Sequence, residues 1–371
     1  MKIKKTILQV LSIFFSLSIS LSCVSCAIPI QNTQNNITVS WMNSDGTLLE
    51  TNHIASSEKF EERELPADTD EWHYTGWKIV SSGDVIICIA QRVKKVQYIW
   101  KDHNGTIIQE STGFESEVPT APELPSSTNQ WKYTEWSTEI TEDSYIYTIQ
   151  RTPNEEYFLG NVFQIVLNDE NGKPISTGSG FIFHEDGWFI TNNHVMDGGS
   201  SASAFFDIPD SNNGKDYTQL SVLGGIYNSD EMDIFIGKLD NYEQIDAYYQ
   251  PITLSVDYTL GETTYTIGYP NSSLFMQINE GTLLEEYKDI YGKIYDSYYL
   301  LSDSYIAPGS SGGILINENF EVLGITTIGL YADSTQSVYL AGGSVPTNHF
   351  LSYTQNLKIL DLKPLNEIYT K

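Results

Sequence analysis

The sequence predicts a mainly β protein in which two small repeats precede one larger domain. Of its 371 residues, 40% are hydrophobic and 24 are tyrosines, a composition that favours strands over helices. The chain contains an internal repeat, and its apolar runs are short and bounded by Asp-Gly, Asn-Gly and glycine-rich turns. A chain of this length has room for two or three domains with their own cores.

Residues 1–27 have the pattern of a secretory signal. Three lysines near the N-terminus are followed by an apolar stretch over residues 7–21 and then by small residues. This stretch is short for a membrane-spanning helix, so we favour a cleaved signal over an uncleaved anchor. Cys23 and Cys26 leave two outcomes open, release by a signal peptidase or attachment of a lipid to a cysteine. In either case we expect a secreted protein or one at the extracytoplasmic cell surface.

Net charge and cysteine content argue against several classes of function. The formal charge of −28 disfavours binding to nucleic acid, because the phosphate backbone is itself negative. Cys88 is the only cysteine after the signal, so the sequence predicts neither a disulfide framework nor a cysteine-based zinc site. The chain has no His-Glu-x-x-His motif. We therefore expect no metal and no cofactor.

Two copies of one unit occupy residues 37–92 and 96–151. The second copy follows the first at a constant spacing of 59 residues, as from Trp41 to Trp100. Each copy predicts a strand, an Asp-Gly or Asn-Gly turn, a second strand, a proline-bearing segment and two final strands. The matched positions include Gly46 with Gly105, Pro66 with Pro125, Trp72 with Trp131, Tyr74 with Tyr133, Trp77 with Trp136, and Arg92 with Arg151.

The repeated unit resembles the small β-grasp-like repeats of bacterial surface proteins, of the type found in internalin B. That resemblance implies a stalk or an adhesive module with a cell-surface ligand. The six tryptophans of the two copies have two interpretations. Clustered aromatic rings can stack on sugars or peptides, but a unit this small also needs large aromatic side chains to make a core. We favour the core.

The run from Ser302 to Asn317 contains a candidate nucleophile, Ser311, in the turn Pro-Gly-Ser-Ser-Gly-Gly. Gly309, Gly312 and Gly313 permit left-handed backbone angles and leave space for a substrate. Such a turn can aim two N–H groups at one oxygen atom, as a developing oxyanion requires. A run of this composition is also typical of a flexible loop. A nucleophile therefore needs a base and an orienting acid elsewhere in the chain.

Candidates for both partners precede this turn. His194 follows two expected strands that are joined by an Asp-Gly turn, and Asp233 opens an apolar run. A histidine has the intrinsic pKa of a general base, and an aspartate can hold its ring in the required tautomer. Asp230 is the alternative acid. The order His, Asp, Ser is one of several that build a catalytic triad.

Six motifs in this order resemble those of the HtrA (Deg) serine proteases, within the wider trypsin-like group. The resemblance implies a chymotrypsin-like double β-barrel over residues 157–352. We expect the first protease strand over Tyr157 to Leu167. The first barrel would end near residue 255, and the active site would lie between the barrels. The motifs are Gly178 to Val195, Asp233 to Leu239, Leu260 to Pro270, Ser302 to Asn317, Phe320 to Thr327 and Gly343 to Asn348.

The same resemblance implies a serine endopeptidase that acts on polypeptide substrates. It assigns the nucleophile to Ser311, the general base to His194 and the orienting acid to Asp233. The oxyanion hole would come from backbone N–H groups, those of Ser311 and Gly309.

Tyr305 and Ile306 are the residues that the resemblance implies for the wall of the substrate pocket. Two positions depart from the family pattern. Ser310 stands where asparagine is usual, and Tyr305 stands where a small residue is usual. The sequence therefore leaves the side-chain preference of the pocket open.

Residues 353–371 remain as a C-terminal tail, which is too short for the PDZ domain that follows the protease in many HtrA proteins. We therefore expect no peptide-triggered activation through such a domain. HtrA proteins are commonly trimers, but the sequence leaves the oligomeric state open. The alternative function is that of a latent or inactive protease-fold protein. Such a protein would act in surface adhesion or peptide binding through its repeats.

Overall fold

The computed structural model describes residues 36–115, 117, 119–210, 214–273, 275–288, 298–332, 338–355 and 357–369. The expected signal segment, with Cys23 and Cys26, lies outside these residues. Within them, no helix is long and apolar enough to cross a membrane.

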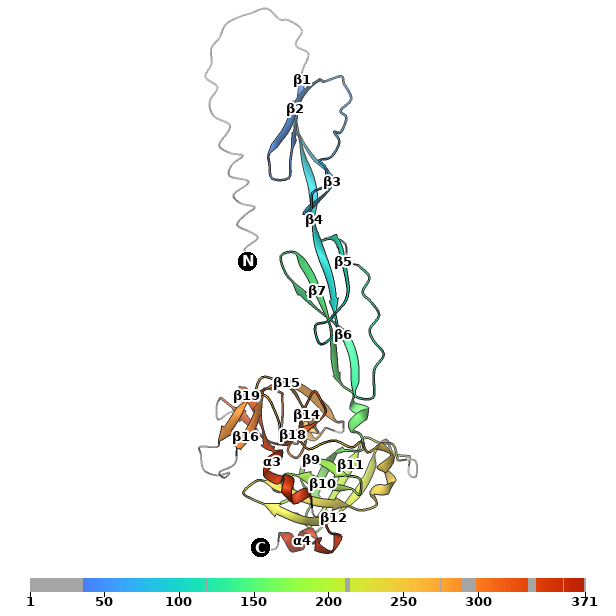
Figure 1. Ribbon diagram of the computed structural model, residues 1–371, viewed down its shortest axis with the longest axis vertical. Coiled ribbons are helices and arrows are strands. Elements are labelled where there is room, and N and C mark those ends of the chain that lie inside the picture. Colours follow the sequence, from blue (N-terminus) through green and yellow to red (C-terminus); the bar gives the residue numbers. More distant parts are fainter. Residues whose placement is uncertain are drawn as a thin grey trace, which may run out of the picture. The chain divides into compact units, whose positions relative to one another are not determined.

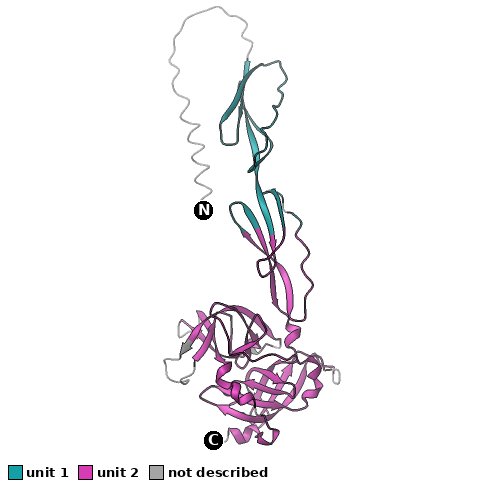
Figure 2. Ribbon diagram, in the orientation of Figure 1, with its two compact units in different colours: residues 1–99, 110–120, 140–145 teal, residues 100–109, 121–139, 146–371 magenta. Residues whose placement is uncertain are grey.

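The chain divides into two compact units, which Figure 2 shows in separate colours. Unit 1 comprises residues 1–99, 110–120 and 140–145, and unit 2 comprises residues 100–109, 121–139 and 146–371. The division passes through the second repeat copy. Much of that copy therefore belongs to the same compact unit as the expected protease domain.

Unit 1 contains the strands of the first repeat copy. Strand β1 (Asn36–Met42) pairs antiparallel with β2 (Leu48–Ala55) and parallel with β4 (Val85–Lys101), and β3 (Trp72–Ser82) pairs antiparallel with β4. The expected Asp-Gly turn joins β1 to β2. Gly46 has a φ of 88° there, in the left-handed region that glycine adopts most readily.

A small core holds the first copy together. Trp41 is 3% exposed, and its ring stacks on Phe60 at 5.7 Å and meets the edge of Trp77 at 4.8 Å. Cys88 is fully buried in the same cluster. Burial raises the pKa of the Cys88 thiol, which disfavours the reactive thiolate. These contacts favour a core role for the two tryptophans.

The second copy contributes the remaining strands before the barrels (Figure 1). Strands β1 to β7 make up one seven-stranded sheet. Trp100 stacks on Tyr147 at 5.4 Å, where the first copy has Cys88 in place of the tyrosine. The strands of this part are β5 (Ile107–Phe114), β6 (Trp131–Ile140) and β7 (Ser144–Pro153).

Trp131 packs differently from a tryptophan in the core of its own copy. It is 8% exposed and belongs to the hydrophobic core of the expected protease domain. Its ring meets the edges of Tyr265 at 5.9 Å and Phe320 at 5.0 Å. The guanidinium of Arg151 lies 3.7 Å from its ring centroid and also pairs with Glu318 at 2.9 Å. The second copy is thus joined to the following domain by an aromatic contact.

Residues from 162 onward form two closed six-stranded barrels, which confirms the predicted fold class. The first has the order β10-β13-β12-β11-β8-β9 and the second the order β14-β15-β16-β19-β18-β17. The strands of the first barrel are β8 (Val162–Asn168), β9 (Pro174–His184), β10 (Trp188–Thr191), β11 (Ser201–Phe206), β12 (Thr218–Ser229) and β13 (Ile234–Leu239). Those of the second are β14 (Thr263–Gly268), β15 (Gln277–Lys288), β16 (Tyr298–Ser302), β17 (Ile314–Asn317), β18 (Val322–Tyr331) and β19 (Tyr339–Pro346).

Strand β13 has a continuous run of apolar residues, whereas a half-exposed strand would show alternating apolar and polar residues. Successive side chains of a strand point to opposite faces. Phe235 belongs to the core that fills the first barrel. Its neighbours Ile234 and Ile236 belong to the cluster that also contains Ile267 and Ile314 of the second barrel. Both faces of the strand are buried, so both carry apolar residues.

A single turn of 3-10 helix, η1 (Glu155–Phe158), occupies the start of the stretch from Tyr157 to Leu167, where the sequence predicted a strand. That prediction was wrong for the first residues. The Asn154 side chain caps the turn by accepting a hydrogen bond from one of its backbone N–H groups at 3.3 Å. Phe158 then points inward and stacks on Phe320 at 5.6 Å.

Short helices complete the structure, and those at the C-terminus return to the barrels. Lys363 pairs with Gly225 of β12, and α4 contacts the same strand (Figure 1). The α-helices are α2 (Asn193–Met196), α3 (Thr347–Phe350) and α4 (Leu365–Ile368). The further 3-10 turns are η2 (Tyr242–Gln244), η3 (Asp246–Tyr248), η4 (Pro270–Ser272), η5 (Leu351–Thr354) and η6 (Ile359–Asp361).

Candidate active site

His194 and Asp233 form a close pair in the first barrel. His194 lies in the short helix α2, and Asp233 immediately precedes β13. Oδ2 of Asp233 is 2.6 Å from Nδ1 of His194, and Oδ1 accepts a hydrogen bond from the His194 backbone N–H at 2.8 Å. Asp233 is 7% exposed, whereas the His194 side chain is 51% exposed. The carboxylate therefore holds one edge of the ring while the rest of the ring faces solvent.

The backbone at Asp233 adopts the conformation that directs its carboxylate toward His194. Its φ of 51° lies in the left-handed region, which is uncommon for residues other than glycine. The Asn192 side chain donates a hydrogen bond to the Asp233 carbonyl oxygen at 3.0 Å. Asp230, the alternative acid, accepts instead from the Asn193 side chain at 2.6 Å. Asp233 is therefore the acid that faces the histidine.

Ser311 reaches the same region from the second barrel. Its hydroxyl donates a hydrogen bond to the Thr327 carbonyl oxygen at 3.3 Å, so it is not directed at His194. The Thr327 hydroxyl in turn accepts a hydrogen bond from the Asn192 side chain at 2.9 Å. Asn192 also contacts Asp233, as described above. Thr327 thus connects the serine of one barrel to the residues that hold the acid in the other.

Ser179, which is fully buried, holds the loop that precedes the serine. Its hydroxyl donates to the Gly309 carbonyl oxygen at 2.7 Å and accepts from the Tyr269 backbone N–H at 2.9 Å. Gly309 has a φ of 101°, which requires glycine. Within the described residues, the backbone N–H groups of Gly309 and Ser311 donate to no protein acceptor.

The two glycines after Ser311 are required by packing as well as by backbone angle. Gly312 has a φ of 86°, and a Cβ there would lie 2.0 Å from the Ser179 carbonyl oxygen and 2.1 Å from Oγ1 of Thr191. A Cβ on Gly313 would lie 2.3 Å from the Ile267 carbonyl oxygen. The sequence interpretation gave these glycines the role of leaving space for a substrate. The structure shows that they also bring the loop close to both barrels.

The two residues expected in the substrate pocket differ in exposure. Tyr305 is 49% exposed, whereas Ile306 is 4% exposed. Tyr339 contacts both, because its ring lies 5.4 Å from that of Tyr305 and its hydroxyl accepts the Ile306 N–H at 3.3 Å. The same hydroxyl donates to the Ser304 carbonyl oxygen at 2.6 Å. Burial raises the pKa of Tyr339 to about 12, so this hydroxyl stays protonated as a donor.

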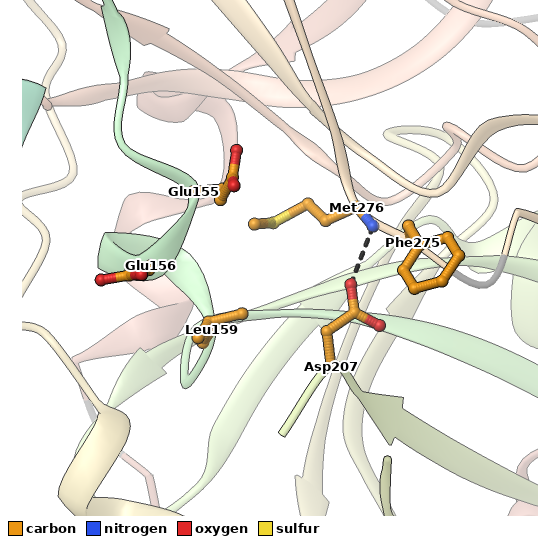
Figure 3. A pocket seen from close by; sticks show the side chains of 6 residues that line it. All are labelled: Glu155, Glu156, Leu159, Asp207, Phe275 and Met276. Atoms are coloured by element: carbon orange, nitrogen blue, oxygen red, sulfur yellow. Dashed lines mark hydrogen bonds between the residues drawn. The ribbon is translucent and has the colours of Figure 1, made fainter. Parts of the chain in front are cut away.

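A separate hollow of about 450 Å³ lies between the end of β11 and the segment before β15 (Figure 3). Asp207 accepts a hydrogen bond across it from the Met276 backbone N–H at 2.9 Å. Burial raises the pKa of the Asp207 carboxyl. The lining residues, none of which belongs to the expected site, are Glu155, Glu156, Leu159, Asp207, Phe275 and Met276.

Sequence reasoning missed three residues that support the site, namely Ser179, Asn192 and Thr327. The first two carried a signal. Ser179 is the centre of a Gly-Ser-Gly sequence, and Asn192 is one of two consecutive asparagines before His194. Thr327 carried none, because it lies 135 residues from Asn192 in the chain and contacts it only in the folded structure.

Comparison with known proteins shows similarity to trypsin-like peptidases. Residues 178–325 match the model of the trypsin-like peptidase domain. This part of the chain is therefore similar to trypsin-like peptidase domains, and the relatives that it matches are described as serine proteases of the HtrA and DegP-like types. It is 31% identical to serine protease HTRA3 of Mus musculus over 202 residues, which are 51% of this chain and 40% of that protein.

One bacterial relative and one solved structure are also among the proteins that the chain matches. The chain is 28% identical over 194 residues to the serine protease Do-like HtrA of Lactococcus lactis, covering 49% of this chain and 45% of the relative. The solved HtrA-type protease AlgW with tripeptide gives a TM-score of 0.44 at 21% identity, covering 54% of this chain and 62% of that one. The chain thus spans less than half the length of these two curated relatives.

Proposed function

We propose that this protein is a serine endopeptidase that cleaves peptide bonds through Ser311, His194 and Asp233. The observation that carries the proposal is the connection at Thr327. The carbonyl oxygen of Thr327 accepts a hydrogen bond from the Ser311 hydroxyl, and its side-chain hydroxyl accepts one from the Asn192 side chain. Asn192 in turn holds the backbone of Asp233, which pairs with His194. Hydrogen bonds through Thr327 and Asn192 thus link the proposed nucleophile to the proposed acid and base, which supports the proposal.

In the first half of the proposed reaction, the Ser311 hydroxyl turns from Thr327 to His194. It gives its proton to Nε2 of His194 while its oxygen bonds to the carbonyl carbon of the substrate. Asp233 remains ionised and stabilises the imidazolium that forms. The substrate carbonyl oxygen becomes negative and binds the backbone N–H groups of Ser311 and Gly309.

The second half regenerates the serine. When the tetrahedral intermediate collapses, the C–N bond breaks and the amine leaves with the proton from His194, so an acyl-enzyme ester remains. A water molecule then gives a proton to His194 and attacks the ester. The C–O bond to Ser311 breaks, the serine oxygen regains the proton, and the acid product leaves.

The substrate is proposed to be an extended polypeptide that pairs with β18 beyond Thr326, because Gly324 and Ile325 are already paired with both β17 and β19. Such a strand gains main-chain hydrogen bonds from the edge that it joins. Tyr305 and Ile306 are proposed to line the pocket for the side chain before the cleaved bond. The 49% exposure of Tyr305 supports this placement, and its bulk in place of a small residue favours a shallow pocket for small aliphatic side chains.

We propose an extracytoplasmic location for the mature protein. The signal-like pattern of residues 1–27 supports it, as does the description of a Rhizobium meliloti relative as a probable periplasmic serine endoprotease, DegP-like. That relative is 30% identical over 156 residues, which are 28% of its length. Lipid attachment at Cys23 or Cys26 and a trimeric assembly both stay predictions, which the intact mass and the molar mass in solution would test.

The direction of the Ser311 hydroxyl favours a second candidate, a latent protease-fold protein that binds peptides or surfaces through its repeats. The hydroxyl is bonded to Thr327 in this structure and would have to turn before it could react. Catalytic hydrogen bonds often form only when substrate binds, so this geometry does not decide against activity. Partner binding by residues 28–152 in the absence of labelling at Ser311 would favour the second candidate.

Labelling with a fluorophosphonate probe tests the proposal without knowledge of the substrate. We expect the wild-type protein to be labelled, and Ser311→Ala to be unlabelled while it retains its fold. Ser221→Ala is the matched control, because this exposed serine of β12 lies outside the turn that bears Ser311 and should leave labelling unchanged. Labelling that persists in Ser311→Ala, or a folded wild-type protein that does not react, would refute the proposal.

A further inference from the structure

The C-terminal segment from Lys363 to Tyr369 is built into the back of the first barrel. Its Lys363 exchanges two backbone hydrogen bonds with Gly225, each at 2.9 Å. Gly224 beside it is at φ 153°, and a Cβ there would lie 2.1 Å from the Lys363 carbonyl oxygen. Leu365 is 3% exposed and belongs to the core of the barrel. The segment is therefore a packed element of the barrel.

The last described residue of this segment, Tyr369, contacts the residue that precedes His194. The Tyr369 hydroxyl donates a hydrogen bond to Oδ1 of Asn193 at 2.6 Å. The amide nitrogen of the same side chain donates to Oδ1 of Asp230 at 2.6 Å. Asn193 is 4% exposed and directly precedes His194. The two polar atoms of the Asn193 side chain are therefore both hydrogen-bonded, the oxygen to Tyr369 and the nitrogen to Asp230.

Tyr369 also contacts the strand that carries the acid. Its ring stacks on Phe235 at 6.4 Å with an angle of 21° between the planes. Phe235 lies two residues after Asp233, within β13. Burial raises the pKa of Tyr369, so its hydroxyl stays protonated and able to donate. One side chain thus touches the turn that bears His194 and the strand that follows Asp233.

We propose that Tyr369 is a positioning residue for the proposed endopeptidase reaction, acting through Asn193 and Asp230 on the alignment of His194 with Asp233. This inference rests on the proposed function. Small displacements of a catalytic group lower the rate of reaction strongly. In this proposal, the general base His194 is held in place by Tyr369, a residue that follows the second barrel in sequence but packs on the first.

The test variant is Tyr369→Phe, which removes one hydroxyl and keeps the ring against Phe235. Tyr217→Phe is the matched control, because this exposed tyrosine lies on the same barrel and packs its ring on Phe205. Both variants are made in the full chain and compared by fluorophosphonate labelling. We expect Tyr369→Phe to lower the maximal labelling rate about three- to tenfold, from the loss of one buried hydrogen bond. The apparent probe affinity and the behaviour of Tyr217→Phe should match those of the wild type.

Two further measurements separate positioning from a general loss of stability. The first is the low-field proton resonance of the short His194–Asp233 hydrogen bond, which Tyr369→Phe should move and Tyr217→Phe should not. The second is a double-mutant cycle with Asn193→Ala. Since the hydroxyl acts through Asn193, Tyr369→Phe should lower the labelling rate no further in that background.

Each outcome decides the inference. Unchanged labelling and an unmoved resonance in Tyr369→Phe would overturn the positioning role, as would effects that simply add in the double mutant. Labelling of the wild type that is lost in Ser311→Ala would keep the proposed function in either of those cases. If the wild type does not react at all, the proposed function fails, and the proton resonance alone decides whether Tyr369 aligns the pair.

Discussion

Replacing Trp131 by alanine should destabilise the peptidase domain, although Trp131 lies in the second repeat. The side chain is 8% exposed and packs edge-on against Tyr265 and Phe320. A buried tryptophan removes about 200 Å² from water, which at about 25 cal/mol per Å² is worth about 5 kcal/mol as an upper estimate. Measured costs of replacing buried Phe or Trp by alanine are about 3–5 kcal/mol. We expect a loss of about 4 kcal/mol in the free energy of unfolding.

Trp72→Ala is the matched control, because Trp72 occupies the equivalent position in the first copy. The Arg92 guanidinium lies 3.7 Å from its ring centroid, as that of Arg151 does from the Trp131 ring. Trp72 belongs to unit 1, however, and lies outside the core cluster of the barrels. Its replacement should therefore remove the same stacking interaction without opening a cavity beside the second barrel.

Hydrogen exchange during urea unfolding can assign the loss to a region. With an m-value of about 2–3 kcal/mol per molar urea, a loss of 4 kcal/mol moves the midpoint by about 1–2 M. Peptides from β14 and β17 should lose protection in Trp131→Ala and keep it in Trp72→Ala. Equal protection of these peptides in the two variants would refute the reasoning, because it would mean that Trp131 is not part of the domain core.

Three further substitutions test individual contacts. Asp233→Asn should lower kcat about 10⁴-fold with the fold unchanged, since an amide leaves the His194 ring in the wrong tautomer; a loss below about tenfold would contradict the assigned acid. Ser179→Ala should slow fluorophosphonate labelling about 10- to 100-fold, because the Gly309 carbonyl loses its donor; an unchanged rate would contradict it. Burial raises the pKa of Asp207, so its ionised form costs stability as pH rises through the raised pKa. Asp207→Asn should therefore melt above the wild type near pH 7 and equal to it near pH 4, and a constant difference would argue against the shift.

Sequence reasoning was most successful where local pattern and chemistry coincide. The apolar runs predicted a mainly β fold, and the motifs of the peptidase resemblance predicted two barrels, which the strand topology confirms. His194 and Asp233 were named as partners and do face each other. That role, like those of Ser311 and the oxyanion donors, stays a prediction until activity is measured.

What sequence reasoning missed depends on contacts between distant segments. Asp233 has a left-handed backbone conformation, which residues other than glycine seldom adopt and which local sequence does not predict. The hydrogen bond from the Asn192 side chain to the Asp233 carbonyl oxygen stabilises this conformation. The start of the expected first strand became η1 because Phe158 finds a partner in Phe320, on the second barrel. Trp131 was assigned to the core of its own repeat, since nothing in the repeat pattern distinguishes it from Trp72.

If the proposed reaction is correct, the Thr327 carbonyl oxygen holds the proposed nucleophile in an unreactive orientation in the absence of substrate. It is an acceptor on the strand along which substrate is proposed to pair, and it is occupied by the nucleophile itself. A substrate whose amide N–H takes over this oxygen displaces the Ser311 hydroxyl and leaves it free to turn toward His194. Binding of the substrate and release of the Ser311 hydroxyl would then occur in the same step. We expect N-methylation of that amide to slow acylation more than it weakens binding, and an equal loss in both would exclude such coupling.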